Sequence, residues 1–316
     1  MTLYKLAERQ KDWHRLEQLM AKRRSTYSSN DAIAFTQLYR SVCTDLSLAS
    51  AYHVPEETVQ YLHELVARAH NHFYGAQKWT FTNLRLLFLQ KIPRLMDKNI
   101  YFRLASAMFW VPFLICTALA YVDPIFAERV LGPITMAQIN EMYSDGFEQR
   151  SVFAGGAGTS FYIYNNVSIA LQCFASGLLL GMGTIYVLLF NGIYLGSVFG
   201  FMLSGPHAHH FGEFVMAHGP LELMGICVSG CAGMRMGFAM LITHGETRIR
   251  SLQKSMSEVM PMVLLAATMI SSAAFIEGFV SPSELPATFK AGVMVVSAAA
   301  ITVYLNLPRL GVNRES

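Results

Sequence analysis

Apolar residues recur at helical spacing in three segments within the first 75 residues. In the first segment Trp13, Leu16 and Met20 fall on one helix face, and residues 34–46 and 59–73 repeat the pattern. An amphipathic helix must bury its apolar face against another surface. The pattern therefore predicts a helical domain over residues 1–78, which we expect to be cytosolic.

Residues 79–103 show a different pattern, in which apolar and basic side chains share one helix. Phe81, Leu84 and Phe88 alternate with basic residues such as Arg85 and Lys91. Such a helix can lie on the inner leaflet of a membrane, with its cations at anionic lipid head groups. An ordinary domain helix with a solvated basic face has the same pattern, and the sequence leaves both interpretations open.

From residue 104 onward the chain is a series of apolar runs, at residues 104–122, 167–190, 193–203, 220–243, 260–279 and 286–305. A membrane crossing takes about 20 residues, so the third run is short for one. We expect an all-α protein: a helical cytosolic N-terminal domain followed, over residues 104–316, by a polytopic α-helical membrane bundle. It should have about six spans, one of them short or broken after Asn191-Gly192.

Residues 123–164, between the first two runs, are acidic and long for a loop. We expect an extracytoplasmic segment that contains short interfacial helices.

Composition and charge support a membrane protein with both termini cytosolic. Hydrophobic residues make up 53% and charged residues 14% of the chain, against about 25% charged residues in soluble domains. Residues 1–103 hold 15 Lys and Arg against 9 Asp and Glu, and a second basic run contains Arg248, Arg250 and Lys254. Cytosolic loops carry such residues, and six crossings would place both regions inside the cytoplasmic (inner) membrane. If residues 192–217 formed only a re-entrant hairpin, the second basic run would lie outside, so a crossing is favoured.

The sequence argues against a signal peptide and against a nucleic-acid partner. No cleavable signal peptide is predicted, because the polar N-terminus has no apolar core region. No nucleic-acid partner is expected either, because no basic face with base-reading elements is present.

Gly192, Gly196 and Gly200 form a ridge of small residues at four-residue spacing. Small residues allow the backbones of two membrane helices to approach closely. The ridge can pack within the chain or form the seam of a homodimer.

His218, Gly219 and Glu222 form a polar start to the fourth apolar run. His218 and Glu222 are four residues apart and share a helix face, and an ionisable group inside a span suggests a function. The pair can act as a structural clasp or line a proton or ion pathway. Further polar candidates within the membrane runs are Asn165, Asn166, Asn191 and Arg235.

His207, His209 and His210 are candidate metal ligands, because imidazole binds zinc. They lack a helical His-x3-His spacing and an HExxH motif, so we expect neither a metal nor a cofactor. No nucleophile elbow, P-loop or dinucleotide-binding turn is present, and we expect no enzymatic activity.

The order of several motifs carries a family resemblance. These motifs include Asn165-Asn166, Asn191-Gly192, Leu195-Gly196, His218-Gly219 and Glu222-Leu223. The chain resembles the stage II sporulation protein M family (SpoIIM, DUF95) of membrane proteins. Its large N-terminal domain departs from the short sporulation type, so a sporulation role is not expected.

The resemblance implies a non-enzymatic membrane scaffold in a complex of the bacterial envelope. It also implies a soluble partner such as a MoxR-type AAA ATPase or a DUF58-type protein. The apolar runs imply membrane lipids as surroundings, and the glycine ridges and the apolar faces of residues 1–75 offer contact surfaces for a homo-oligomer, which we expect to be a twofold dimer. The alternative is a transporter or channel that uses the broken third helix and the pair His218 and Glu222.

Overall fold

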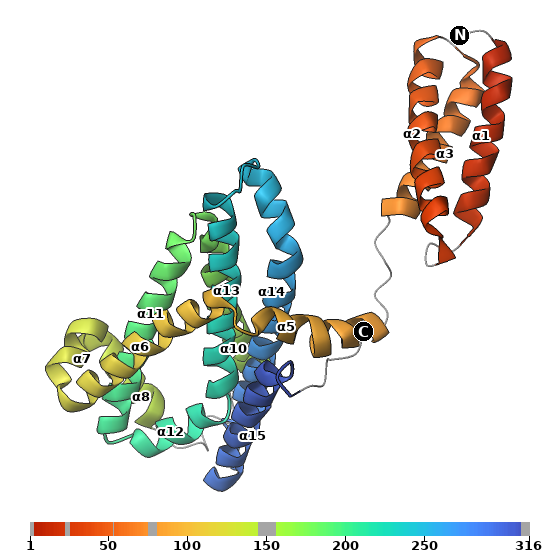
Figure 1. Cartoon of the computed structure of the whole chain (residues 1–316). Helices are drawn as coiled ribbons and strands as arrows, with labels where there is room; N and C mark the ends of the chain where they lie inside the picture. The colour runs from red at the N-terminus through yellow and green to blue at the C-terminus, as the bar shows by residue number, and fades with distance from the viewer. Residues whose placement is uncertain (1–2, 23–25, 53, 75–80, 145–155, 311–316) are drawn as a thin grey trace. The chain divides into compact units, whose positions relative to one another are not determined.

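The computed structural model describes residues 3–22, 26–52, 54–74, 81–144 and 156–310, and every regular element within these ranges is a helix (Figure 1). The predicted all-α fold is therefore confirmed. The chain divides into two compact units, residues 1–80 and 81–316. Each unit has its own hydrophobic core.

The N-terminal unit is a bundle of three helices, α1 (Leu3–Ala21), α2 (Ser29–Ala51) and α3 (Glu56–Tyr74). Its core brings together the apolar faces that the sequence pattern predicted, including Trp13, Leu16, Val42 and Leu62, and it also contains Phe35. Ser28 caps the start of α2, and hydrogen bonds from its N–H and hydroxyl lower the pKa of Asp31. This local exchange of hydrogen bonds stabilises the start of the helix.

A buried carboxylate links α1 to α2 inside this bundle. Asp45 is only 2% exposed, and its Oδ1 accepts a hydrogen bond of 2.7 Å from the Arg9 guanidinium. Trp13 Nε1 donates to Asp45 Oδ2 at 3.0 Å. Both oxygens thus have donors and the charge has a cation, which a buried carboxylate requires.

The second unit begins with the basic segment, which forms α4 (Phe81–Leu86), a π-helical turn (Leu87–Lys91) and α5 (Ile92–Met96). Residues 79–80 of the predicted helix lie outside the described residues. Ile92 and Met96 are buried in the core of the membrane unit, and the Tyr304 hydroxyl donates to the Phe88 carbonyl at 2.8 Å. The segment is thus anchored to α15, while the side chains of Arg85 and Lys91 are exposed.

Five of the remaining helices are long and apolar enough to cross a membrane, which makes this a multi-pass membrane protein. They are α6 (Ile100–Val122), α11 (Met182–Ser204), α13 (Gly219–Leu241), α14 (Arg248–Phe279) and α15 (Ala287–Asn306). Helix α10 (Gly156–Ala175) also has 20 residues, which is a crossing length, but the apolar stretch at this place is the shorter Asn166–Leu178.

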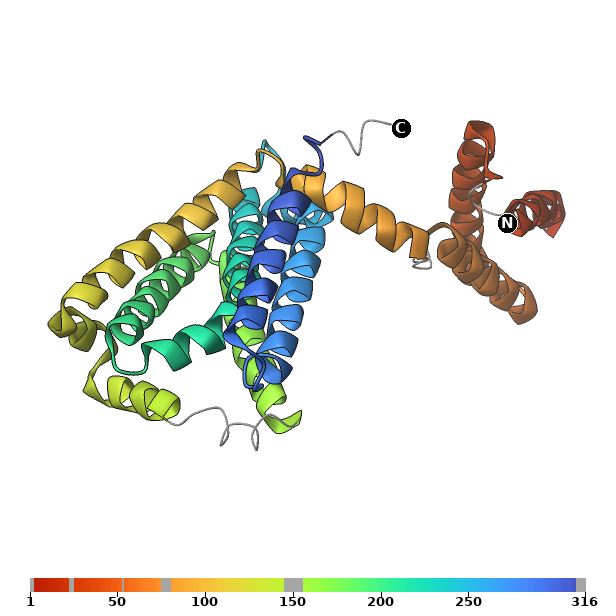
Figure 2. The same cartoon turned by 90° about the horizontal axis from the view of Figure 1, so that it is seen from below.

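Shorter helices lie at one end of this unit. They are α7 (Pro124–Leu131), α8 (Pro133–Ser144) and α12 (Ala208–Met216). The first two are the short helices expected between residues 123 and 164, of which residues 145–155 lie outside the described part. Figure 2 shows α7, α8, α12 and the turn between α14 and α15 at one end, and the α13–α14 connection at the other.

The position of the helix break differs from the prediction. Residues 167–190 are not one helix: α10 ends at Ala175, and a 3-10 turn (Ser176–Leu178) leads to α11. Leu180 and Gly181 have positive φ angles of 55° and 84°, which reverse the chain. The third apolar helix is therefore neither short nor broken at Asn191-Gly192.

Asn191 and Gly192 are compatible with the helix α11, Asn191 through a hydrogen bond and Gly192 through its packing. The Asn191 amide donates to the Val187 carbonyl within the same helix at 2.8 Å. A Cβ on Gly192 would lie 2.5 Å from the Phe109 carbonyl oxygen of α6, so the close approach of the two helices requires glycine.

The whole glycine ridge faces α6. A Cβ on Gly196 would collide with Phe113, and one on Gly200 would collide with Thr117. Of the two interpretations of the ridge, packing within the chain is the one that the structure shows.

Candidate functional site

The candidate site is a group of ionisable side chains at the end of the membrane unit where α13 begins. His218 is the residue before the first turn of α13, and Glu222 lies in that turn. Glu277 lies near the end of the antiparallel helix α14. Because α13 and α14 pack side by side, the start of one helix meets the end of the other. We call these three residues the His218 cluster.

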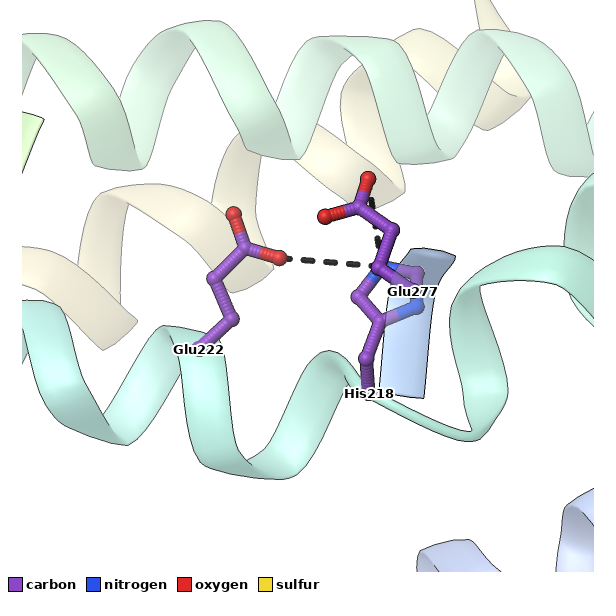
Figure 3. A group of neighbouring side chains, drawn as sticks. All are labelled: His218, Glu222 and Glu277. Carbon is purple, nitrogen blue, oxygen red and sulfur yellow. Dashed lines mark ion pairs between the residues drawn. The ribbon is translucent and has the colours of Figure 1, made fainter. Parts of the chain in front are cut away.

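The carboxyl groups of Glu222 and Glu277 both lie beside the His218 ring (Figure 3). Nε2 of His218 is 3.6 Å from Glu222 Oε2 and 4.0 Å from Glu277 Oε1. One donor atom from each residue lies within 4.8 Å of the other two. His218 and Glu277 are buried, with 3% and 7% exposure, and 18% of the Glu222 side chain is exposed.

Neighbouring polar groups hold the cluster in place. His218 Nδ1 lies 2.9 Å from the Ser281 hydroxyl oxygen, in the turn after α14. The Asn166 amide of α10 donates to Glu277 Oε2 at 2.8 Å. The buried ammonium of Lys290, near the start of α15, donates to the Ser281 carbonyl at 3.0 Å. Groups from α10, α13, α14 and α15 thus meet at one point.

The other candidate residues from the sequence lie elsewhere. The three ridge glycines pack against α6, Asn191 donates to the Val187 carbonyl within α11, and the Asn165 side chain lies outside the described residues. Gly219 is buried in the first turn of α13. Arg235 lies in the last third of α13, where its Nε donates to Glu258 Oε2 at 2.8 Å.

The three candidate metal-binding histidines do not converge. His209 is highly exposed, and its Nε2 lies 3.5 Å from Glu213 of the same helix. His210 Nδ1 instead lies 3.2 Å from the Tyr143 carbonyl oxygen of α8. Within the described residues, the group whose donor atoms could share one metal ion is the His218 cluster.

Three residues of this region are not among the candidates that the sequence offers: Glu277, Ser281 and Lys290. Glu277 carried a usable signal, because it is a charged residue inside a predicted span, and such residues suggest a function. Its pairing with Asn166, 111 residues away, has no sequence signal. Ser281 carried no signal of its own, because serine is common in turns.

Comparison with protein families gave two matches. A family model described as stage II sporulation protein M matches residues 106–282, more than half of the chain, and includes the whole His218 cluster. A second model, a domain of unknown function (DUF8413), matches residues 6–75, which lie in the N-terminal unit. Neither the curated proteins nor the solved structures gave a match.

Proposed function

The chain belongs to the stage II sporulation protein M family, and we propose that it is a non-enzymatic membrane scaffold of an envelope-associated complex. The observation that carries this proposal is the separate N-terminal unit. It has a core of its own and matches a family model of its own, so it is a module added to the membrane unit. Such a module can bind a soluble partner while the membrane unit anchors the complex.

We place this module in the cytosol, and the protein in the inner membrane. Six crossings return the chain to the side on which it entered. The exposed side chains of Arg248, Arg250 and Lys254 lie at the α13–α14 connection, and those of Arg85 and Lys91 lie before the first crossing. Basic residues at cytosolic loops support this orientation.

Reporter fusions test the orientation. A phosphatase that is active only outside the cytosol should be active after Val122 and inactive after Arg250. Activity after Arg250 would contradict the six-crossing topology.

The soluble partner that we propose is a MoxR-type AAA ATPase or a DUF58-type protein, as the family resemblance suggests. Crosslinking in intact cells, followed by mass spectrometry, tests this with the full chain and with a chain that lacks residues 1–80. Deletion should remove the crosslinks to the soluble partner while the membrane unit still inserts and accumulates. The same crosslinks in both strains would reject the module as the recruiting element.

We also propose a homodimer. The glycine ridge is occupied by α6, so the dimer surface must lie elsewhere. Helix α15 is the least buried of the five crossing helices and exposes Val295, Val296 and Val303. Light scattering of the protein in mild detergent gives its mass, and a monomer at micromolar concentration would contradict the dimer.

Transport is the alternative function, and it is favoured by the ionisable groups inside the membrane unit. The transport hypothesis also relied on a broken third helix. That helix is not broken, because α11 runs without interruption from Met182 to Ser204. A cavity of about 630 Å³ lies between α6, α11, α12, α13 and α15, with a lining that includes Phe113, Phe199 and Met294. None of the residues of the His218 cluster lines it, so this cavity does not supply a polar path to Glu222.

A further inference from the structure

We propose that His218, Glu222 and Glu277 bind a divalent transition-metal ion, with Zn²⁺ as the best-fitting candidate. The ion would be held by His218 Nε2 and by one carboxylate oxygen of each glutamate. This site does not depend on the scaffold function, because it follows from these side chains and their contacts.

The first argument is the spacing of the donor atoms. In a plain ion pair between imidazolium and carboxylate, nitrogen and oxygen lie about 2.7–2.9 Å apart. Here Nε2 lies 3.6 Å and 4.0 Å from the two carboxylates, beyond a good hydrogen bond. Two ligands of a tetrahedral zinc ion, each about 2.0–2.1 Å from the metal, lie about 3.4 Å apart. The observed spacing is therefore closer to that of ligands around an ion than to that of a direct pair.

The second argument is the set of groups that orient the ligands. A metal-bound histidine usually donates its other ring N–H to an oxygen, and a metal-bound carboxylate usually accepts a further hydrogen bond. His218 Nδ1 faces the Ser281 hydroxyl at 2.9 Å, so an N–H there leaves the Nε2 lone pair directed at the carboxylates. The Asn166 amide occupies Glu277 Oε2, which leaves Oε1 facing His218.

The third argument is charge. Two carboxylates that share a membrane-embedded site are costly unless cations compensate them. Within the cluster a single imidazolium supplies one positive charge, and the nearby Lys290 ammonium donates to the Ser281 carbonyl. A divalent ion supplies two charges between the carboxylates and leaves the histidine neutral, as metal binding requires. The ligand set of one imidazole and two carboxylates suits a transition metal, whereas Mg²⁺ and Ca²⁺ prefer oxygen ligands only.

An ion at this point would link helices of the membrane unit. The exposed edge of Glu222 lies near the start of α13, and Glu277 lies near the end of α14, so the site is close to one end of the bundle. The ion would fasten α13 to α14 directly, and α10 through Asn166. We therefore expect metal binding to raise the thermal stability of the membrane unit.

The test measures bound zinc on the full chain in detergent, after removal of any polyhistidine tag and treatment with a chelator. Wild-type protein that is incubated with ZnCl₂ and desalted should retain about one zinc ion per chain by mass spectrometry of the metal. Zinc should raise its melting temperature by about 5 °C, and Mg²⁺ should not. Glu277→Gln preserves the side-chain volume and should lower zinc affinity by at least about tenfold.

His209→Gln is the matched control, because His209 and Glu213 form a similar pair, four residues apart, without a third ligand. This variant should bind zinc as the wild type does. Ser281→Ala tests the orienting contact and should weaken zinc binding about 10- to 100-fold without removing a ligand.

Three results would overturn the proposal. They are a wild type that retains no zinc, equal zinc in wild type and Glu277→Gln, and equal loss in His209→Gln and Glu277→Gln. If Glu277→Gln does not yield folded protein, Glu222→Gln replaces it under the same criteria, because its side chain is partly exposed and tolerates change better. The crosslinking result for residues 1–80 is independent of all three.

Discussion

Asp45 in the N-terminal unit and Glu277 in the membrane unit are both buried acids, but their surroundings differ. Asp45 receives a cation and a neutral donor at 2.7 Å and 3.0 Å. Glu277 receives one neutral donor at 2.8 Å and faces a histidine 4.0 Å away that also serves Glu222. Asp45 therefore has a cation and a donor for each oxygen. In the His218 cluster, the described contacts give two carboxylates only one imidazole as a counter-charge. The difference indicates which cluster should respond to an added cation.

Asp45→Ala should have the largest effect on stability of the variants considered for these two acids. It leaves the Trp13 N–H and the Arg9 guanidinium without their acceptor, and breaking such a pair costs about 3 kcal/mol. Urea unfolding of a fragment of residues 1–80, followed by circular dichroism, measures the loss in the free energy of unfolding.

Asp12→Ala is the control for this variant. Asp12 is partly exposed and lies 3.9 Å from Arg9, so its removal should cost less than about 0.5 kcal/mol. Equal losses in the two variants would show that the Asp45 contacts add nothing beyond an ordinary surface charge.

The second prediction concerns Glu222→Gln and has opposite signs with and without zinc. Without metal, the variant should melt at or above the wild-type temperature, because it removes one of two neighbouring carboxylates. With zinc, the wild type should gain about 5 °C and the variant less than about 1 °C. The measurement is melting of the full chain in detergent under both conditions. A variant that melts well below wild type without metal would show that the cluster is already complete without an ion.

The sequence predicts which helices form better than it predicts where the helices end. Helical periodicity located α1 to α3, because an amphipathic face repeats whatever its partner is. The turn at residues 176–181 was missed because Leu178, Leu179 and Leu180 are as apolar as a helix interior, and hydropathy does not report a positive φ angle. Asn191-Gly192 predicts a break because both residue types often end helices. In the structure the glycine packs against α6 and the asparagine amide donates within α11, so the helix continues.

For the candidate site, the sequence predicts the pair on α13 but not its partner on α14. His218 and Glu222 are four residues apart, so their contact follows from helix geometry. Glu277 joins them only because α13 and α14 run antiparallel, with the start of one beside the end of the other. No local pattern records that pairing. A charged residue near the end of an otherwise apolar run was the one clue available.

A third acid, at the opposite end of α13 and α14, should matter least for stability. Arg235 of α13 and Glu258 of α14 form a direct pair at 2.8 Å, partly exposed, with the Arg235 guanidinium 5.8 Å from the centre of the Tyr101 ring. Because the pair is complete and solvent reaches it, Glu258→Gln should lower the free energy of unfolding by less than about 1 kcal/mol. That corresponds to about 2–4 °C in melting temperature. The zinc-induced rise should stay at its wild-type size, since no ligand has changed. A Glu258→Gln variant that loses the zinc response would place the ion at this end of the α13–α14 pair instead of at His218.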